Sequence, residues 1–233
     1  MLSLKSGFNF RDRGFKHTLV LIPGWATDYR IFDGLKLDYN YLLATRLYPS
    51  DFNQALLNQL DQLKIGKVSV FGFSLGGFLG SEFAAKFPER ISELILLGMR
   101  KCYEPKILED IKYEIQKNSR PWLYKFYANC FSQADTQGLR WFRKNLLKEY
   151  THNLSLNELI WGLDYLSSHA FRPGSLAKIE NIRIFHGSED LIAPISEALE
   201  IKADLPQAKF IYLAGAGHLS FLNPVFRERF YDA

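Results

Sequence analysis

The sequence predicts an α/β protein in which a mostly parallel sheet is covered by helices on both faces and carries a helical insertion. Two observations support this fold class. Short apolar runs rich in β-branched residues alternate with amphipathic stretches, which is the pattern of parallel strands joined by crossover helices. One long interval, residues 101–179, has no strong strand pattern and shows the periodicity of helices instead.

The expected strands are the apolar runs bounded by turn residues. They cover residues 17–23, 39–48, 67–73, 93–99, 181–186 and 209–214. Between the second and third runs, Phe52, Leu56 and Leu60 recur at a helical spacing, so residues 51–63 are predicted to form a helix packed on the sheet. A second crossover helix is expected at residues 78–87. These elements place the core in residues 1–100 and 180–233.

Residues 101–179 are expected to form a helical lid inserted into that core. The predicted helices lie at residues 105–117, 120–131, 137–150 and 156–167. Ser155 and Glu158 at the start of the last helix have the spacing of a capping box.

Composition excludes several classes of protein. The 233 residues are 47% hydrophobic and 23% charged, as in folded globular proteins. The cysteines, Cys102 and Cys130, are too few for a disulfide scaffold and lack the spacing of a zinc site. No stretch approaches the ~18 apolar residues of a membrane span, and residues 1–14 lack a signal-peptide core. We expect a cytoplasmic, monomeric protein with no metal, no cofactor and no membrane association.

The strongest functional motif is Gly72-Phe73-Ser74-Leu75-Gly76, which lies between a predicted strand and a predicted helix. A strand that turns abruptly into a helix strains the residue at the turn, and small residues two before and two after it let the backbones approach. The motif therefore predicts a nucleophile elbow with Ser74 exposed above the sheet.

A serine hydroxyl needs a base to take its proton and an acid to orient that base. His218 follows a predicted strand and a glycine-containing loop, and we identify it as the base; the other histidines suit structural or exposed positions. Asp190 is the preferred acid over its neighbour Glu189, which we interpret as a solvated loop charge. The order Ser74, Asp190, His218 is the order expected for this kind of elbow. Backbone N–H groups of Leu75 and Trp25 are the candidate oxyanion donors.

These motifs resemble the α/β-hydrolase superfamily along nearly the whole chain. The resemblance lies in Pro23-Gly24-Trp25, in residues 72–77 (GFSLGG), in residues 186–194 (HGSEDLIAP) and in residues 215–224 (GAGHLSFLNP). Within the superfamily the sequence is most similar to the pimeloyl-acyl carrier protein (ACP) methyl ester carboxylesterases of biotin synthesis. The resemblance implies an α/β-hydrolase fold with the triad and oxyanion donors named above. The chain departs from the family in having Pro23 where a histidine commonly stands.

The insertion carries a concentrated positive charge. Residues 112–148 hold eight basic and two acidic residues, a net charge of +6 that exceeds the +4 of the whole chain. Such a surface attracts anions, and ACP is strongly acidic. The candidate ACP-binding residues are Arg120, Lys125, Arg140, Arg143, Lys144 and Lys148, four of them on one predicted helix face. No groove-reading motif accompanies the charge, so nucleic acid is not expected as a partner.

Aromatic residues of the insertion are candidates for the acyl-binding wall. Phe126, Tyr127 and Phe131 are the predicted substrate-binding residues, together with the Trp25 indole, although such a stripe is also typical of helix packing. The resulting hypothesis is a serine esterase that cleaves the methyl ester of pimeloyl-ACP through an acyl-enzyme on Ser74. A general short-chain carboxylesterase or acyl thioesterase is the alternative with the same triad. A non-catalytic α/β-hydrolase that binds a small ligand or ACP is an alternative of another class.

Overall fold

The computed structural model describes residues 5–232 of the chain. Its centre is a seven-stranded sheet with the order β1-β3-β2-β4-β5-β6-β7, in which β1 runs antiparallel to β3 and all other neighbours are parallel. The strands are β1 (Gly7–Arg11), β2 (Thr18–Ile22), β3 (Asn40–Arg46), β4 (Val68–Phe73), β5 (Ile91–Leu97), β6 (Ile182–Gly187) and β7 (Lys209–Leu213). All the strands predicted from apolar runs are confirmed. Strand β1 was not predicted, because this partly exposed edge strand has no apolar run.

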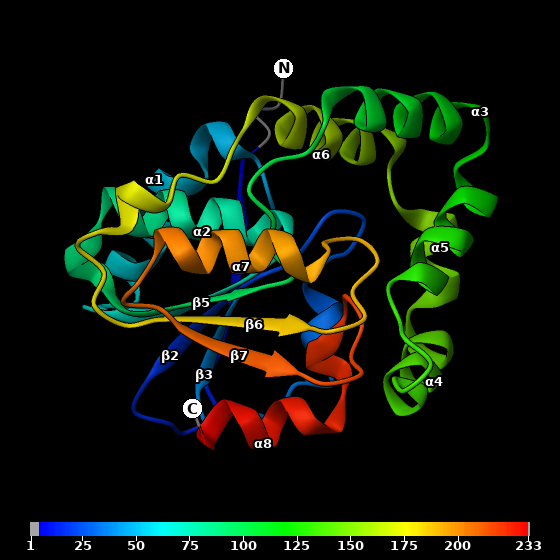
Figure 1. The fold of residues 1–233 in the computed structure, drawn as a ribbon. Coiled ribbons are helices and arrows are strands. Elements are labelled where there is room, and N and C mark those ends of the chain that lie inside the picture. Colours follow the sequence, from blue (N-terminus) through cyan, green and yellow to red (C-terminus); the bar gives the residue numbers. More distant parts are fainter. Residues whose placement is uncertain (1–4, 233) are drawn as a thin grey trace.

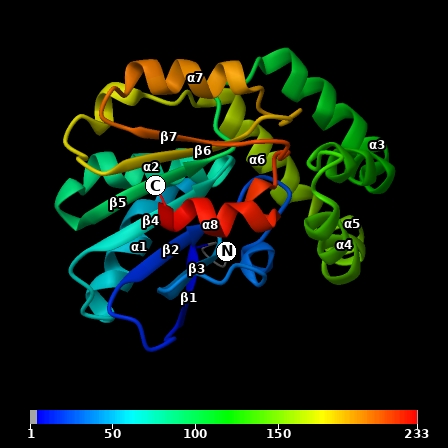
Figure 2. The same ribbon diagram turned by 60° about the horizontal axis from the view of Figure 1, so that its bottom comes forward.

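Helices cover both faces of the sheet. Those of the core are α1 (Pro49–Gln62), α2 (Leu75–Lys86), α7 (Ile195–Asp204) and α8 (Pro224–Asp232), with short 3₁₀ helices η1 (Tyr29–Phe32), η2 (Pro88–Arg90) and η4 (Ser220–Leu222). A further 3₁₀ helix, η3 (Pro173–Leu176), lies in the interval between β5 and β6. Helices α1, α2 and α7 lie on one face, whereas α8 and η1 lie on the other (Figures 1 and 2).

Alternate side chains of β4 supply the two layers of the core. The Phe71 ring contacts Phe32 of η1 and Phe226 of α8. Val70, one residue earlier, faces α2, where a Cβ on Gly80 would lie 3.0 Å from its side chain. Every residue of β2 and β4 is buried. A strand that is covered on both faces has a nearly continuous run of apolar residues in its sequence. For this reason β2 and β4 could be predicted from the sequence.

The interval between β5 and β6 contains α3 (Pro105–Asn129), α4 (Thr136–Asn145), α5 (Leu147–Asn153) and α6 (Leu156–Ser168). These helices, called here the inserted helices, lie beyond the end of the sheet toward which the parallel strands point (Figure 1). Helix α3 is interrupted at Asn118, whose φ of −160° and ψ of 94° are not helical, and Pro121 follows within a turn. Proline lacks an N–H and crowds the preceding turn, which explains this interruption. The prediction of two separate helices at residues 105–117 and 120–131 is therefore correct.

The single helix predicted over residues 137–150 is wrong. The chain breaks at Leu146, where φ is −127° and ψ is −30°, and α5 starts in a new direction. The break lets Phe142 of α4 and Tyr150 of α5 both pack against Tyr127 of α3. At the start of α6, Ser155 occupies the N-cap position but makes no side-chain cap hydrogen bond, so the predicted capping box is not formed.

Candidate active site

Ser74 stands at the sharp turn between β4 and α2. Its φ of 51° and ψ of −117° are far from the conformations that L residues normally adopt. Neighbouring glycines make the turn possible: a Cβ on Gly72 would lie 2.5 Å from Gly77 Cα, and one on Gly76 would overlap the Ile22 carbonyl oxygen. The structure thus has the strand, turn and helix that the motif predicted.

Asp190 and His218 are brought together from the loops that follow β6 and β7. His218 Nδ1 lies 2.7 Å from Asp190 Oδ2, and both side chains are buried. The other carboxylate oxygen accepts backbone N–H groups of Ile192 and Ala193, each at 2.8 Å. These bonds fix the carboxylate plane. Glu189, the alternative acid, is exposed.

The electrostatics of this pair favour an ionised carboxylate. Burial raises the pKa of Asp190, but the charges and hydrogen bonds around the carboxylate, those of His218 foremost, together outweigh burial and hold that pKa below its ordinary value. An ionised Asp190 accepts the Nδ1 proton and leaves Nε2 as the basic nitrogen of His218. A second buried histidine, His186, lies beside the pair, with Nε2 3.7 Å from Asp190 Oδ2. Burial lowers the pKa of His186, which keeps its ring neutral.

His218 and Ser74 occupy the same corner of the molecule. The ring of Phe73, the residue before Ser74, lies with its centroid 4.9 Å from that of the imidazole. On the other side, a Cβ on Gly98 would lie only 2.9 Å from His218 Cε1. Within residues 5–232 no hydrogen bond joins the Ser74 hydroxyl to His218. Bonds of this kind often tighten only when substrate binds.

The backbone at Trp25 and Leu75 flanks the Ser74 side chain. Leu75 begins α2, and a Cβ on Gly24 would lie 3.1 Å from Ser74 Cβ. Neither the Trp25 nor the Leu75 N–H donates to a protein acceptor in the described part of the chain. Two unpaired amides at such a position are available to an oxygen atom of a ligand. The Trp25 indole is fixed by a 2.8 Å hydrogen bond from Nε1 to the carbonyl of Leu159 in α6.

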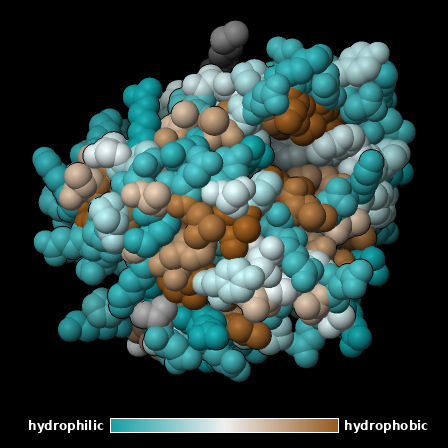
Figure 3. Space-filling view, viewed as in Figure 1, coloured by the Kyte–Doolittle hydropathy of each residue, from teal (hydrophilic) through white to brown (hydrophobic). Residues whose placement is uncertain are grey.

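Ser74 opens into a cavity of about 560 Å³ between the core and the inserted helices. Most of its lining is apolar and comes from α3, α6 and the loop after Asp190. The lining residues are Trp25, Ser74, Arg100, Tyr103, Ile107, Leu108, Ile111, Glu114, Trp122, Lys125, Phe126, Asn129, Leu163, Leu166, Leu191 and Ile192. Ile107 and Leu191 are 50% and 71% exposed, which puts hydrophobic surface at the mouth. Figure 3 shows hydrophobic residues on either side of a hollow between the inserted helices and the core.

Of the predicted substrate-binding residues, Trp25 and Phe126 line this cavity, whereas Tyr127 and Phe131 do not. Each helical residue is rotated by about 100° from the one before it, so Tyr127 projects from a different side of α3 than Phe126. The Tyr127 hydroxyl donates to the Ala26 carbonyl, and the Phe131 ring packs on Phe142. Both side chains therefore belong to the packing of the inserted helices.

Arg100 and Tyr103 are cavity residues that sequence reasoning missed. Both follow β5, and open α/β sheets place their sites at the carboxyl ends of parallel strands. Their position after a predicted strand could therefore have identified them as site residues. Burial raises the pKa of Tyr103 to about 12, a shift that the nearby Ser74 hydroxyl partly offsets, so the phenol is neutral at physiological pH. Arg100 pairs with Glu197 at 2.6 Å and lies over the Tyr103 ring.

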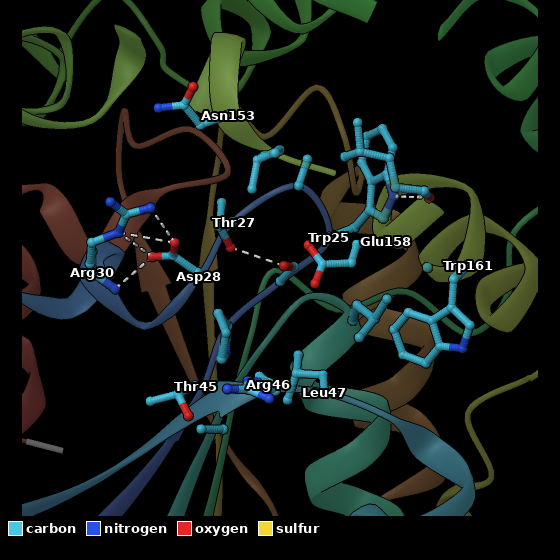
Figure 4. Close-up of a pocket in the computed structure, with 18 residues that line it drawn as sticks. Trp25, Thr27, Asp28, Arg30, Thr45, Arg46, Leu47, Asn153, Glu158 and Trp161 are labelled. Atoms are coloured by element: carbon cyan, nitrogen blue, oxygen red, sulfur yellow. Dashed lines mark hydrogen bonds and ion pairs between the residues drawn. The ribbon is translucent and has the colours of Figure 1, made fainter. Parts of the chain in front are cut away.

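A second, smaller cavity of about 220 Å³ lies behind Trp25 and does not include Ser74. Figure 4 shows its residues, which come from the loop after β2, from the end of β3 and from α6. Asp28 and Arg30 form an ion pair on one side, and Glu158 and Trp161 of α6 stand on the other. Trp25 lines both cavities, so its indole separates them.

The predicted basic surface is exposed but belongs to three helices. Its members are Arg120 and Lys125 of α3, Arg140, Arg143 and Lys144 of α4, and Lys148 of α5. The expected continuous helix face from 140 to 148 is wrong, because of the break at Leu146. None of these six side chains forms an ion pair with another residue in the range 5–232. Lys125 also lines the Ser74 cavity, which connects the basic surface to the mouth.

Residues 5–232 contain no group of three or more His, Cys, Asp or Glu side chains arranged to hold a metal ion. None of their helices combines the length and hydrophobicity needed to span a membrane.

Comparison with known proteins now defines the class. Residues 41–161 match the family model described as alpha/beta hydrolase fold, and the chain belongs to this family, which confirms the predicted fold class. Among solved structures, an esterase from Exiguobacterium antarcticum superposes with a TM-score of 0.80 at 19% identity, covering 97% of this chain and 93% of that one.

Two relatives are similar along most of their length. The pimeloyl-[acyl-carrier protein] methyl ester esterase of Nitrosomonas europaea is 25% identical over 237 residues, which cover 91% of this chain and 92% of the relative. The protein of the same name from Legionella pneumophila strain Paris is 26% identical over 221 residues, covering 88% and 89%. Both relatives carry the name of the esterases to which the sequence motifs are most similar.

Proposed function

We propose that this protein is a serine esterase that hydrolyses the methyl ester of pimeloyl-ACP. The observation that carries the proposal is the position of Ser74, at a strained turn beside the bonded His218–Asp190 pair and on the floor of a largely apolar cavity. Residues 1–100 and 180–233 act as the catalytic core in this proposal. Residues 101–179 act as a lid that supplies most of the cavity wall.

The proposed nucleophile is the Ser74 hydroxyl. His218 Nε2 takes its proton as Ser74 Oγ attacks the ester carbonyl carbon, and Asp190 stabilises the imidazolium that forms. The buried, hydrogen-bonded position of Asp190 suits this role, because the carboxylate stays ionised and keeps the Nδ1 proton directed toward itself. His186 is excluded as the base, because its Nε2 is bonded to the Ala193 carbonyl oxygen at 2.7 Å.

Attack converts the ester carbonyl oxygen into an oxyanion, which needs hydrogen-bond donors. The unpaired N–H groups of Leu75 and Trp25 are the proposed donors. Removal of one such donor typically costs ~10²–10³ in kcat. The Trp25 indole, bonded to Leu159, holds its loop at a fixed distance from Ser74.

Collapse of the tetrahedral intermediate breaks the bond to the methoxy oxygen, and His218 donates its proton so that methanol leaves. Water, deprotonated by His218, then attacks the acyl-enzyme and releases the free carboxylate. The low exposure of the reacting groups, 5% for Ser74 and 2% for His218, limits competing water during the first step. The apolar lining from α3 and α6 suits a methylene chain.

The acyl chain of this substrate is attached to a carrier protein, so the cavity must open toward a surface that binds an acidic partner. Lys125 lines the cavity and is exposed. The other five candidate residues are also exposed and have no ion-pair partner within residues 5–232; they are Arg120, Arg140, Arg143, Lys144 and Lys148. Opposite charges steer association and set the orientation of a partner. These features favour ACP as the partner over a free small ester.

The test is hydrolysis of methyl pimeloyl-ACP compared with free methyl pimelate and p-nitrophenyl butyrate, at low and moderate salt, with Ser74→Ala as the blank. The proposal predicts a strong preference for the ACP ester that weakens as salt rises, because exposed charges are screened. Activity on small esters alone would identify a general carboxylesterase. Release of the whole acyl group from ACP would identify a thioesterase, and a folded protein without any turnover would favour a binding protein.

A further inference from the structure

The loop that carries His218 is held from two sides. Residues 214–219, called here the histidine loop, contact the core through the Glu189 N–H, which donates to the Ala216 carbonyl at 2.9 Å. On the opposite side the loop contacts the turn between α3 and α4. There the Leu219 N–H donates to the Cys130 carbonyl at 3.1 Å, and the Ser132 hydroxyl donates to the Gly215 carbonyl. The inserted helices are thus bonded directly to the loop of the proposed base.

Asp135 is the centre of this second set of contacts. Its Oδ2 accepts the Gly217 N–H at 2.7 Å and the Ser132 N–H at 2.9 Å, and its Oδ1 accepts the Asn223 side-chain amide at 2.8 Å. Gly217 directly precedes His218. A Cβ on Gly217 would lie 2.8 Å from the Cys130 carbonyl oxygen, so the two segments approach as closely as their backbones permit.

The position of Asp135 makes this use of its carboxylate unusual. It is the N-cap residue of α4, where an aspartate normally accepts N–H groups of its own helix, yet its side chain makes no such bond. It is only 2% exposed, and no cation pairs with it among the described residues. A buried carboxylate without a cation is costly unless several donors surround it. Here those donors come from the turn, from the histidine loop and from the segment before α8.

We propose that Asp135 is a positioning residue that holds the histidine loop, and through it His218, in register with Ser74 and Asp190. The proposal rests on the assignment of His218 as the general base. It adds that the inserted helices do more than form the cavity wall: their α3–α4 turn completes the support of the base. Loss of the Asp135 bonds is expected to move the imidazole without changing the cavity that binds substrate.

The primary measurement is the rate constant for labelling of Ser74 by a small fluorophosphonate, together with kcat and KM for p-nitrophenyl butyrate. Both reactions need His218 as the base but little of the cavity. Displacement of a reacting group by about 1 Å can cost about 10²-fold in rate. Asp135→Ala is therefore expected to lower the labelling rate and kcat by about 10- to 100-fold, with KM within about twofold of the wild-type value.

A paired exchange provides the rescue test. In Asp135→Asn the new side-chain NH₂ group faces the NH₂ group of Asn223, so two donors meet without an acceptor. Asn223 is not free to turn its oxygen toward position 135, because that Oδ1 accepts the Val225 N–H at 3.1 Å. Adding Asn223→Asp restores an acceptor for the new amide at position 135 and keeps the acceptor for Val225. The single variant is expected to lose about tenfold in labelling rate, and the double variant to recover to within about threefold of the wild type.

Thr151→Ala is the matched control for general loosening of the inserted helices. Thr151 is 4% exposed in α5 and donates to the Leu147 carbonyl at 2.7 Å, away from the histidine loop. It is expected to label at the wild-type rate even where its melting temperature falls. Circular dichroism identifies any variant that does not fold. If Asp135→Ala does not fold, the comparison of Asp135→Asn with the double variant tests the proposal on its own.

Four results would overturn the proposal. Wild-type labelling rates in both Asp135 variants would show that the carboxylate does not position the base. Equal slowing in Thr151→Ala, or slowing of Asp135→Asn without recovery in the double variant, would show a general effect of the inserted helices. A folded wild-type protein that does not label at Ser74 would instead overturn the proposed function, and the role of Asp135 with it.

Discussion

Gly98 offers a direct test of how tightly the proposed base is packed. This residue follows β5 with a φ of 63°, and a Cβ at this position would lie 2.9 Å from His218 Cε1 and 3.1 Å from His218 Nδ1. Ordinary contact begins near 3.4 Å, so Gly98→Ala requires the imidazole to retreat by at least about 0.5 Å. The ring cannot retreat freely, because Phe73 lies against it and Asp190 is bonded to Nδ1.

The expected cost follows from that displacement. Since about 1 Å of misplacement can cost about 10²-fold, a shift of half that size predicts a fall in kcat of about tenfold, with little change in KM. Alanine in the left-handed region also costs about 1–2 kcal/mol of stability in the folded state. The two effects are separable, because only the first requires proximity to His218.

Gly14→Ala is the matched control. Gly14 has a φ of 79°, but a Cβ there would meet nothing within 4 Å. Both variants are assayed for turnover of p-nitrophenyl butyrate, for fluorophosphonate labelling and for melting temperature. Similar losses of stability with slow turnover only in Gly98→Ala would support the reasoning. Turnover by Gly98→Ala at the Gly14→Ala rate would refute it, because the base would then tolerate the displacement.

Three further predictions concern the nucleophile, the basic surface and the buried histidine. Ser74→Ala should abolish turnover with little change in melting temperature, because a small side chain is removed; retained turnover would refute the nucleophile assignment. Changing Arg140, Arg143 and Lys144 to Glu should slow hydrolysis of the ACP ester about tenfold or more but leave p-nitrophenyl butyrate unaffected, whereas equal losses on both would indicate collapse of the inserted helices. Because burial lowers the pKa of His186, the unfolded chain binds a proton first as the pH falls below about 6.5, so acidification destabilises the folded state. His186→Gln should therefore lose less stability than the wild type in urea titrations from about pH 7.5 to about pH 5.5, and equal losses would contradict this assignment.

The sequence revealed the parts of the candidate site that follow strands. Ser74, Asp190 and His218 each come soon after a strand of the parallel part of the sheet, and parallel strands deliver such residues to one edge of the sheet. Their approach could be expected from order and spacing alone. The strain at Ser74 was equally readable, because glycines at Gly72 and Gly76 are required by backbone contacts that the motif implies.

Other features depend on tertiary packing and could not be read from local patterns. Asp135 bonds to Gly217, a residue 82 positions later, and nothing near it in the sequence marks that contact. The break at Leu146 serves packing between α4 and α5 around Tyr127, although the residues themselves are compatible with a continuous helix. For the same reason the aromatic stripe of α3 could not be divided in advance into Phe126, which lines the cavity, and Tyr127, which does not.

The most direct test of the central claim is the identity of the intermediate formed from methyl pimeloyl-ACP. Turnover is stopped with acid during steady state, and the enzyme is analysed by intact and peptide mass spectrometry. Attack on the methyl ester expels methanol and leaves ACP joined through the pimeloyl chain to the peptide containing Ser74. The proposed function predicts this enzyme–ACP adduct, and Ser74→Ala should not form it. A methyl pimeloyl group on Ser74 with free ACP thiol, or turnover with no adduct on the Ser74 peptide, would contradict it.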